Sequence, residues 1–380
     1  MRVLLISHAY AAPINREKVQ ALSRRPDLEM SLLVPRLWKE GERTYATEPG
    51  KQDGYSIFAG SVLFPGRVTG HVYRSGLVRA LRVARPDVIH LEQEPWGLVT
   101  AQVIFASGMF RPRPKLVLFS FENLDLDLPW YFRMIERKTL AAAEVIIAGG
   151  ESALGRLRRQ GASPERLTVL PQFGLDPQSF RPPAEGERPD VFTVGFIGRH
   201  VHQKGVDLLI RALAELKGDW RAIFIGDGPK RNEWEALARG HGIGGRIDFT
   251  GWVDHFEIPA MLRQMDVLVL PARTTATSRE QFGHVLIEAM SSGVVPVGSD
   301  SGEIPGVIGK EGFIFPEEGA GELGGILQEL RDKPELRNRF SEAGRERVLR
   351  EYSWEVFAER THAIYERAIA AGKEIPGRAE

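Results

Sequence analysis

The chain has 380 residues, in which 50 Lys and Arg balance 50 Asp and Glu, and it contains no cysteine. This length predicts two or three domains, and the missing cysteines exclude a disulfide scaffold, a thiolate metal site and a cysteine nucleophile. No apolar run in the sequence approaches the roughly 20 residues that span a bilayer, so we expect a cytoplasmic protein.

Short apolar runs rich in branched side chains alternate with amphipathic stretches along the chain. Strands are expected at residues 3–7, 30–34, 88–91, 116–119, 145–148, 168–170, 192–197, 221–225, 247–250, 267–270, 294–297 and 313–315. Helices are expected at residues 15–23, 72–84, 131–142, 205–216, 231–240, 258–264, 285–291, 335–351 and 353–370. Apolar strands that alternate with helices are typical of parallel sheets covered on both faces.

The alternation of strands and helices restarts after a stretch rich in proline and charge, at residues 182–190. We therefore expect two doubly wound α/β domains, residues 1–180 and 191–353, joined by a linker at residues 181–190. Residues 354–380 begin with an amphipathic helix, which we expect to cross back to the first domain.

The balanced charge conceals an asymmetry between the two halves. Residues 1–175 hold 24 Lys and Arg against 17 Asp and Glu, whereas the remaining residues hold 26 against 33. Cations gather at residues 74–85 and 111–115, and a solvated helix face is the plainer interpretation. Peripheral contact of this basic domain with the inner face of an anionic membrane is the alternative. No nucleic-acid-binding module is apparent, so we expect no nucleic acid partner.

The first candidate site follows the strand expected at residues 192–197. Gly198 ends the strand, and Arg199 and Lys204 precede the helix that begins near Gly205. Two cations and free backbone N–H groups at a helix start suit a diphosphate. Taken alone, the pattern would describe two solvated cations on a loop.

The second candidate site is a pair of carboxylates, Glu280 and Glu288, with seven residues between them. Glu280 is expected in the loop after the strand at residues 267–270, and Glu288 on the following helix. A carboxylate near a helix start is stabilised by the helix dipole and accepts hydrogen bonds from sugar or ribose hydroxyls. Taken alone, the pair would be a helix-start carboxylate and a surface glutamate.

The order and spacing of these motifs resemble glycosyltransferase family 4. The segments that carry the resemblance are Gly174-Leu175-Asp176 with Phe180, Gly198-Arg199, Lys204-Gly205, Gly226-Asp227-Gly228-Pro229, Asp266 to Pro271, Glu280 with Glu288, and Gly293-Val294-Val295-Pro296-Val297. The resemblance implies the GT-B fold, in which two Rossmann-like parallel-sheet domains face each other across a cleft. It also implies a retaining hexosyltransferase of glycoconjugate biosynthesis, which uses a UDP-sugar, GDP-sugar or similar donor without a metal or cofactor.

The resemblance also implies roles for individual residues. Arg199 and Lys204 correspond to the clamp on the donor diphosphate, and Glu280 to the glutamate that holds the donor sugar; we take these three as catalytic. Glu288 corresponds to the ribose ligand. The other positions implied in donor binding are Gly198, Trp252, Val253, Phe282, Gly283, His284 and Val285. Trp252 could equally belong to the core. The implied mechanism is front-face attack by the acceptor hydroxyl, with a donor phosphate oxygen as the base.

The first half departs from the family pattern. The loop after the first strand lacks the usual glycines, and the family's His-x-His-Glu-Pro element appears as His90-Leu91-Glu92-Gln93-Glu94-Pro95. The position of its second histidine therefore falls to Glu92, or to Gln93 if one residue is inserted. We expect an acceptor side rich in carboxylates, with the candidates His8, His90, Glu92, Gln93 and Glu122. A core role is equally open for His8 and His90.

Two other functions fit the same sequence. A nucleotide-sugar 2-epimerase would use the same fold, but its donor site would need acid and base residues facing the sugar, and the glutamate pair disfavours this interpretation. A non-catalytic partner that binds a nucleotide sugar stays open because of the altered histidine position. We expect a nucleotide sugar and a hydroxyl acceptor as partners, the acceptor being a glycan, a lipid-linked glycan or a small molecule.

Overall fold

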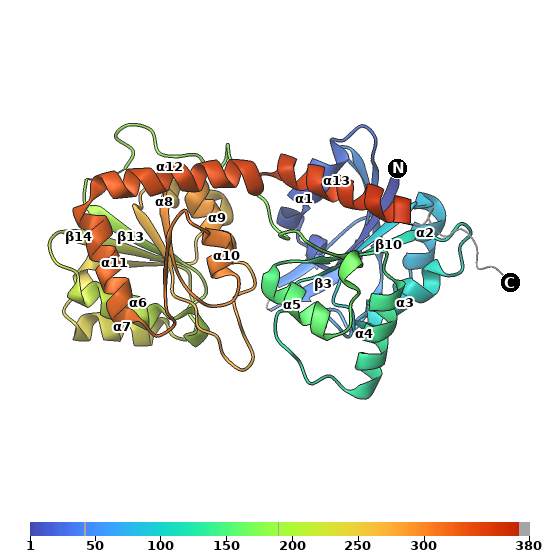
Figure 1. Ribbon diagram of the computed structural model, residues 1–380, viewed down its shortest axis with the longest axis horizontal. Coiled ribbons are helices and arrows are strands. Elements are labelled where there is room, and N and C mark those ends of the chain that lie inside the picture. Colours follow the sequence, from blue (N-terminus) through green and yellow to red (C-terminus); the bar gives the residue numbers. More distant parts are fainter. Residues whose placement is uncertain (42, 189, 372–380) are drawn as a thin grey trace. The chain divides into compact units, whose positions relative to one another are not determined.

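The computed structural model describes residues 1–41, 43–188 and 190–371, which form two compact units (Figure 1). One unit comprises Met1–Gln172 together with the described residues from Trp354 to Ala371, and the other comprises Phe173–Ser353. Each unit is built around one main parallel sheet with helices on both faces, which confirms the predicted fold class.

The first unit has an eight-stranded sheet in the order β12-β11-β10-β9-β1-β2-β6-β5. Its strands are β1 (Arg2–Ile6), β2 (Glu29–Pro35), β5 (Gly50–Gln52), β6 (Tyr55–Gly60), β9 (Val88–Glu92), β10 (Lys115–Ser120), β11 (Val145–Ala148) and β12 (Leu167–Val169). All neighbours are parallel except β5 and β6. Two short antiparallel hairpins lie outside this sheet, β3 (Leu37–Glu40) with β4 (Arg43–Ala46) and β7 (Val62–Leu63) with β8 (Val72–Tyr73).

Alternate side chains of β1 enter the two different cores of this unit. Val3 and Leu5 pack beneath helices α1 (Glu17–Ser23) and α13 (Trp354–Ala371). Leu4 and Ile6 pack on the opposite face against α2 (Leu77–Ala84) and α3 (Leu98–Ser107). This two-residue alternation is the pleat of a strand that is buried on both sides. This unit also contains the helices α4 (Trp130–Ala142) and α5 (Glu151–Arg159).

The prediction of one helix over residues 72–84 is wrong in its first half. The chain forms strand β8 there, and α2 starts only at Leu77. Gly76 interrupts the helix because its φ of 95° lies outside the helical region, and a Cβ at this position would lie 2.6 Å from Cα of Gly60.

The second unit has a six-stranded, fully parallel sheet in the order β15-β14-β13-β16-β17-β18. Its strands are β13 (Phe192–Ile197), β14 (Trp220–Ile225), β15 (Ile247–Gly251), β16 (Val267–Leu270), β17 (Val295–Ser299) and β18 (Phe313–Phe315). The strand order reverses between β13 and β16, and in the first unit between β1 and β9. Doubly wound sheets bind their ligands beside such a switch point, at the carboxyl ends of the strands.

Two groups of helices cover the second sheet. Helices α6 (Val206–Glu215), α7 (Arg231–Gly240) and α11 (Ala320–Asp332) share one core. On the other face lie α8 (Ile258–Leu262), α9 (His284–Ser291), α10 (Ile304–Ile308) and the C-terminal end of α12 (Pro334–Glu351). None of the helices in the described part of the chain is long and apolar enough to cross a membrane.

The segment after Gln172 packs on the second unit. Arg345 of α12 donates hydrogen bonds to the carbonyl oxygens of Pro177 (3.0 Å) and Phe180 (2.8 Å), and Ser291 Oγ donates to the same Phe180 oxygen at 2.7 Å. These contacts hold the chain ahead of residues 181–190 against α9 and α12, so the second unit begins at Phe173.

Candidate functional site

The loop after β13 is built around Gly205. It adopts a φ of 63°, and a Cβ there would lie 1.8 Å from the carbonyl oxygen of Pro271, at the end of β16. Only glycine avoids both the strained φ and the overlap. The start of α6 therefore lies directly against the loop that follows β16, on the two sides of the switch point.

Lys204 and Glu280 form an ion pair in this place. The Lys204 ammonium donates to Glu280 Oε2 at 2.5 Å, and both side chains are partly exposed. The Glu280 loop is itself fixed, because its carbonyl oxygen accepts from the amide of Glu303 at 3.1 Å. The structure thus brings together two of the three predicted catalytic residues.

Arg199, the third residue of that set, is exposed on the same loop, two residues after the end of β13. Among the described residues, no hydrogen bond or ion pair engages its guanidinium. The backbone around it is fixed by two hydrogen bonds. The Gly198 amide donates to the carbonyl oxygen of Ile225 (3.0 Å), and the His200 amide donates to the backbone carbonyl oxygen of Asp227 (2.8 Å). A fixed backbone that presents an unpaired cation suits an anionic ligand.

Arg273 is a residue that sequence reasoning missed. Its guanidinium forms hydrogen bonds with both carboxylate oxygens of Asp207 on α6, at 2.6 and 2.8 Å, and also reaches Glu318. Its amide donates to the carbonyl oxygen of Gln203 at 2.8 Å. Burial alone would raise the pKa of Asp207, but the hydrogen bond and charge of Arg273 hold it below its ordinary value. Arg273 therefore fastens the Lys204 loop to the loop after β16. The only sequence signal was an arginine close behind a buried strand.

Helix α9 places Glu288 between two imidazoles. Glu288 is buried, with Oε1 3.7 Å from Nδ1 of His284 and 4.0 Å from Nε2 of His255. Gly283, with a φ of 77°, precedes the helix, and His284 begins it. Glu288 is thus one helical turn inside the helix, on the side of His284.

The other predicted donor-binding residues differ in exposure. Phe282 is buried and packs against the rings of Phe173 and Tyr352, at centroid distances of 5.8 and 5.9 Å. Val285 is half-buried beside the same core. After β15, Val253 also packs on this core, whereas Trp252 is largely exposed. This exposure contradicts a core role for Trp252.

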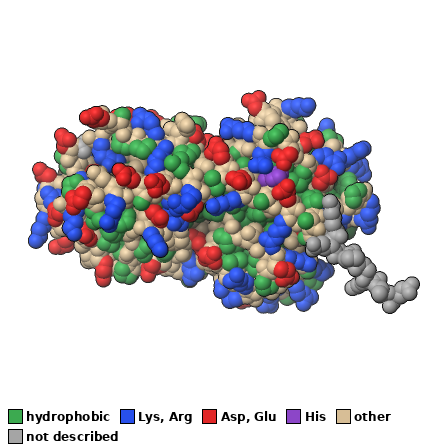
Figure 2. Space-filling view, turned by 45° about the horizontal axis from the view of Figure 1, so that its top comes forward, with side chains coloured by type: hydrophobic (Ala, Val, Ile, Leu, Met, Phe, Trp, Pro, Cys, Tyr) green, Lys and Arg blue, Asp and Glu red, His purple; other side chains and the backbone are tan. Residues whose placement is uncertain are grey.

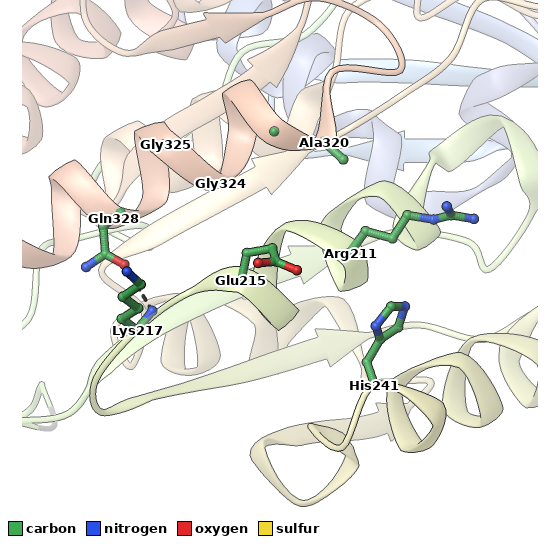
Figure 3. A pocket seen from close by; sticks show the side chains of 9 residues that line it. Arg211, Glu215, Lys217, His241, Ala320, Gly324, Gly325 and Gln328 are labelled. Atoms are coloured by element: carbon green, nitrogen blue, oxygen red, sulfur yellow. Dashed lines mark hydrogen bonds between the residues drawn. The ribbon is translucent and has the colours of Figure 1, made fainter.

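Two hollows of the second unit border α6, and another of about 530 Å³ lies beside α7 and β15. One of about 360 Å³ is lined by His202, Asp207 and Lys230, so it borders the loops after β13 and β14. The other, of about 420 Å³, lies between α6 and α11 (Figure 3). In it the Lys217 amide donates to Gln328 Oε1 at 3.0 Å. The lining of this second hollow contains none of the predicted site residues.

In the first unit, His8 and Gln93 meet at the switch point. His8 follows β1 and Gln93 follows β9, and Nδ1 of His8 lies 2.8 Å from Nε2 of Gln93. Burial lowers the pKa of His8 to about 4, and the neighbouring His71 adds to this shift. The His8 ring is therefore neutral near pH 7, and it packs 4.6 Å from the Trp38 ring.

Glu92 is engaged inside the first unit. Its Oε1 pairs with the Lys18 ammonium, and its Oε2 accepts from the Tyr10 hydroxyl at 2.7 Å. His90 is fully buried beside it, 3.6 Å from Oε1, and its Nδ1 lies 2.7 Å from the Tyr365 hydroxyl. These contacts join the loop after β1 to α13 through the centre of the sheet.

The remaining predicted acceptor residue, Glu122, caps its own loop. Glu122 Oε1 accepts from the amides of Asn123 and Leu124, both at 3.0 Å. Its neighbour Glu94 is buried and accepts from Ser120 Oγ at 2.6 Å. The described part of the chain contains no group of three or more His, Asp or Glu side chains arranged to hold a metal ion.

Known proteins resemble both units. Residues 12–172 match the family model "Glycosyl transferase 4-like domain", and residues 178–347 match "Glycosyl transferases group 1". The 2-deoxystreptamine glucosyltransferase of Streptomyces kanamyceticus is 31% identical over 245 residues, which are 62% of this chain and 57% of that protein. The alpha-D-kanosaminyltransferase of the same organism is 28% identical over 61% of this chain and 56% of that protein.

A solved structure covers nearly the whole chain. HepE of Anabaena, in a crystal structure in complex with UDP, superposes with a TM-score of 0.74 at 16% identity, over 96% of this chain and 100% of that one. The curated relatives named above are matched over little more than half of their length. The two family models together match most of the chain, and the chain therefore belongs to the GT4-type glycosyltransferases with the GT-B fold.

Proposed function

We propose that this chain transfers a sugar from a nucleoside diphosphate sugar to a hydroxyl acceptor, with retention of anomeric configuration and without a metal ion. The observation that carries the proposal is the Lys204–Glu280 pair at the switch point, beside the exposed guanidinium of Arg199. Two cations at a loop-to-helix junction can neutralise a diphosphate, and a carboxylate beside them can accept hydrogen bonds from sugar hydroxyls.

Donor binding would rearrange the ion pair. The Lys204 ammonium would turn to the diphosphate together with Arg199, which leaves Glu280 to accept from the donor sugar hydroxyls. Glu288 would bind the ribose, the backbone amides of residues 283–285 would face the phosphates and sugar, and Trp252 would stack on the base. As the bond to the leaving phosphate breaks, both cations would stabilise the developing negative charge.

The acceptor would bind in the first unit. Among the predicted residues there, Glu92 and His90 are engaged in contacts of the fold. Gln93 is also buried, but it contacts the half-buried His8 where β1 and β9 end. We assign acceptor contacts to His8 and Gln93. The acceptor hydroxyl would attack the anomeric carbon on the side of the leaving group, and its proton would pass to an oxygen of the donor phosphate.

The first experiment identifies the donor. Thermal melting of the intact chain with UDP, GDP, ADP and their sugars should show one base that raises Tm, because a ligand that binds only the folded state stabilises it. The nucleoside diphosphate sugar with that base, radiolabelled in its sugar, is then incubated with and without candidate acceptors to measure transfer. Release of nucleoside diphosphate that depends on an acceptor supports the proposal, and full activity in excess EDTA supports its metal independence.

Variants test the site. Lys204→Ala and Glu280→Ala should each lower kcat/KM by about 10²–10³-fold, which is the usual effect of removing one preorganised group. The matched control is Lys333→Ala, which breaks an exposed ion pair with Glu329 (2.8 Å) and should leave the rate unchanged. Unchanged rates in Lys204→Ala and Glu280→Ala would overturn the assignment.

The same assay distinguishes the two alternatives. A nucleotide-sugar 2-epimerase would convert the donor to its epimer without an acceptor. A non-catalytic partner would bind the nucleotide in the melting assay but consume no donor with any acceptor. A cytoplasmic location stays a prediction.

A further inference from the structure

Helix α4 of the first unit exposes its aromatic side chains and buries polar ones. The side chains of Trp130, Tyr131 and Met134 are 69%, 45% and 39% exposed. The buried face instead carries Glu136, whose carboxylate accepts from Arg156 at 2.8 Å, with Thr139 and Leu140. A helix that only covered a core would show the opposite arrangement, so its outer face is suited to a partner.

The same outer face is cationic. Arg133, Arg137 and Lys138 are exposed, and none of the ion pairs among the described residues involves them. The only carboxylate on α4, that of Glu136, is buried. Figure 2 shows Lys and Arg side chains gathered beside hydrophobic ones at the lower edge of the first unit, the end where Figure 1 draws α4.

The loop before α4 contributes one exposed apolar side chain and two acidic ones. Leu126 is exposed there, and so are Asp125 and Asp127. Asp125 is neutralised by Arg159, whose guanidinium donates to it at 2.8 Å. Within the helix, residues 130, 133, 134 and 137 follow the i, i+3, i+4, i+7 spacing of one face, so aromatic, apolar and cationic groups alternate on a single surface.

We propose that α4 docks this chain on the surface of an anionic lipid bilayer. Tryptophan and tyrosine rings favour the headgroup region, where one side of the ring is apolar and the other is wet. Arg133, Arg137 and Lys138 would face the negative headgroups, and each such cation strengthens attraction to an anionic surface. This inference goes beyond the proposed function, because docking requires neither donor nor acceptor.

The surface differs from the basic stretches that the sequence singled out. On α2, Arg79 and Arg82 accompany only the exposed aliphatic side chains of Val78 and Val83. In the other stretch, Arg111 donates to the carbonyl oxygens of Gly108 and Phe110. Phe105 and Met109 are exposed near the second stretch, but Arg111 there is engaged by the two backbone oxygens. Helix α4 joins two exposed aromatic rings to three exposed cations, so it is the better lipid-binding face.

The test is flotation of the intact chain with lipid vesicles at about 50 mM salt, where surface charges are weakly screened. Vesicles with about 30 mol% phosphatidylglycerol in phosphatidylcholine should bind the protein, and pure phosphatidylcholine should bind it at least tenfold more weakly. Arg133→Gln with Arg137→Gln should weaken binding about thirtyfold, and Trp130→Ser with Tyr131→Ser at least tenfold. The folded state of each variant is checked by thermal melting.

Two control variants match these changes. Arg79→Gln with Arg82→Gln removes two cations from α2, and Phe256→Ser removes a ring that is 83% exposed on the second unit. Both should bind vesicles like the unchanged protein. Trp130→Phe should keep the binding but lose part of the vesicle-induced blue shift of tryptophan fluorescence.

Three results would overturn the proposal. One is no binding of the unchanged protein to phosphatidylglycerol vesicles at low salt. Another is that the α4 variants bind as tightly as the α2 control. The third is a pair of results: single-stranded RNA or an acidic protein displaces all of the chain from the vesicles, and the Trp130→Phe variant still shows the full blue shift of tryptophan fluorescence. Because no sugar is present in this assay, its failure is independent of the failure of the proposed function.

Discussion

The Lys204 ammonium lies 2.5 Å from Glu280 Oε2 and joins the loops that follow the two central strands of the second sheet. In the first sheet, His8 and Gln93 make the corresponding contact at 2.8 Å, again from the loops after two neighbouring strands. Both pairs lie where the strand order reverses. Each unit thus places a polar pair at the position where a doubly wound sheet binds its ligand.

Gly205→Ala should destabilise the second unit. A left-handed φ costs a residue with Cβ about 1–2 kcal/mol, and the new Cβ would also lie 1.8 Å from the Pro271 oxygen. We expect the free energy of unfolding in urea to fall by more than about 2 kcal/mol, together with a loss of nucleotide binding. Gly321→Ala on α11 is the control, because its Cβ meets no atom within 4 Å, and it should be neutral or slightly stabilising. Equal effects of the two changes would contradict the packing described here.

Arg273→Ala should loosen the Lys204 loop without removing a predicted ligand group. It deletes the bonds to Asp207 and leaves that carboxylate without its cation. Hydrogen bonds between charged groups of this kind contribute roughly 1.5–3 kcal/mol, which we expect as the loss in unfolding free energy. Nucleotide affinity, measured by calorimetry at a temperature where the variant is folded, should fall as well. Undiminished affinity would show that Lys204 does not depend on Arg273 for its position.

Lys18→Met alone should lower the free energy of unfolding more than the double change Lys18→Met with Glu92→Gln. The single change leaves the fully buried Glu92 carboxylate without its cation, and breaking a buried pair in this way costs about 3–5 kcal/mol. In the double variant the Gln side chain is uncharged and can still accept from Tyr10. Urea unfolding of both single variants and the double variant gives the coupling energy. Additive losses would mean that the two charges do not stabilise each other.

The sequence predicted all six strands of the second sheet and six of the eight strands of the first, because buried strands in such sheets are continuous apolar runs, as at Val267–Leu270. It missed β5 and β6, which lie at one edge of the first sheet. It also predicted the neighbourhood of Lys204 and Glu280, since topology alone brings these loops together. It could not predict the pairing of Glu92, because the partner Lys18 lies 74 residues earlier on a different element. The short hairpins in the first unit were missed as well, since strands of two to four residues are too short to show periodicity.

Glu94→Gln should change how stability depends on pH. Burial raises the pKa of Glu94 to about 7, although hydrogen bonds from Ser120 and the Phe121 amide oppose the shift. The folded state therefore keeps a proton on Glu94 that the unfolded chain releases near its ordinary value of 4.5. This contribution to stability is complete below pH 4.5 and is lost as the pH rises through 7.

Glu94→Gln abolishes that titration, and Gln can keep the hydrogen bonds with Ser120 and the two backbone amides. The variant should therefore gain stability relative to the unchanged protein between pH 4.5 and 7, by up to about 3 kcal/mol. Burial lowers the pKa of His90 to about 4, which works in the opposite direction by destabilising the fold as the pH falls below 6.5. The informative quantity is the difference in the free energy of unfolding between the variant and the unchanged protein, measured in urea at each pH. The contribution of His90 is the same in both proteins and cancels in this difference. A difference that stays constant from pH 4.5 to 7 would show that Glu94 is already ionised within the folded chain.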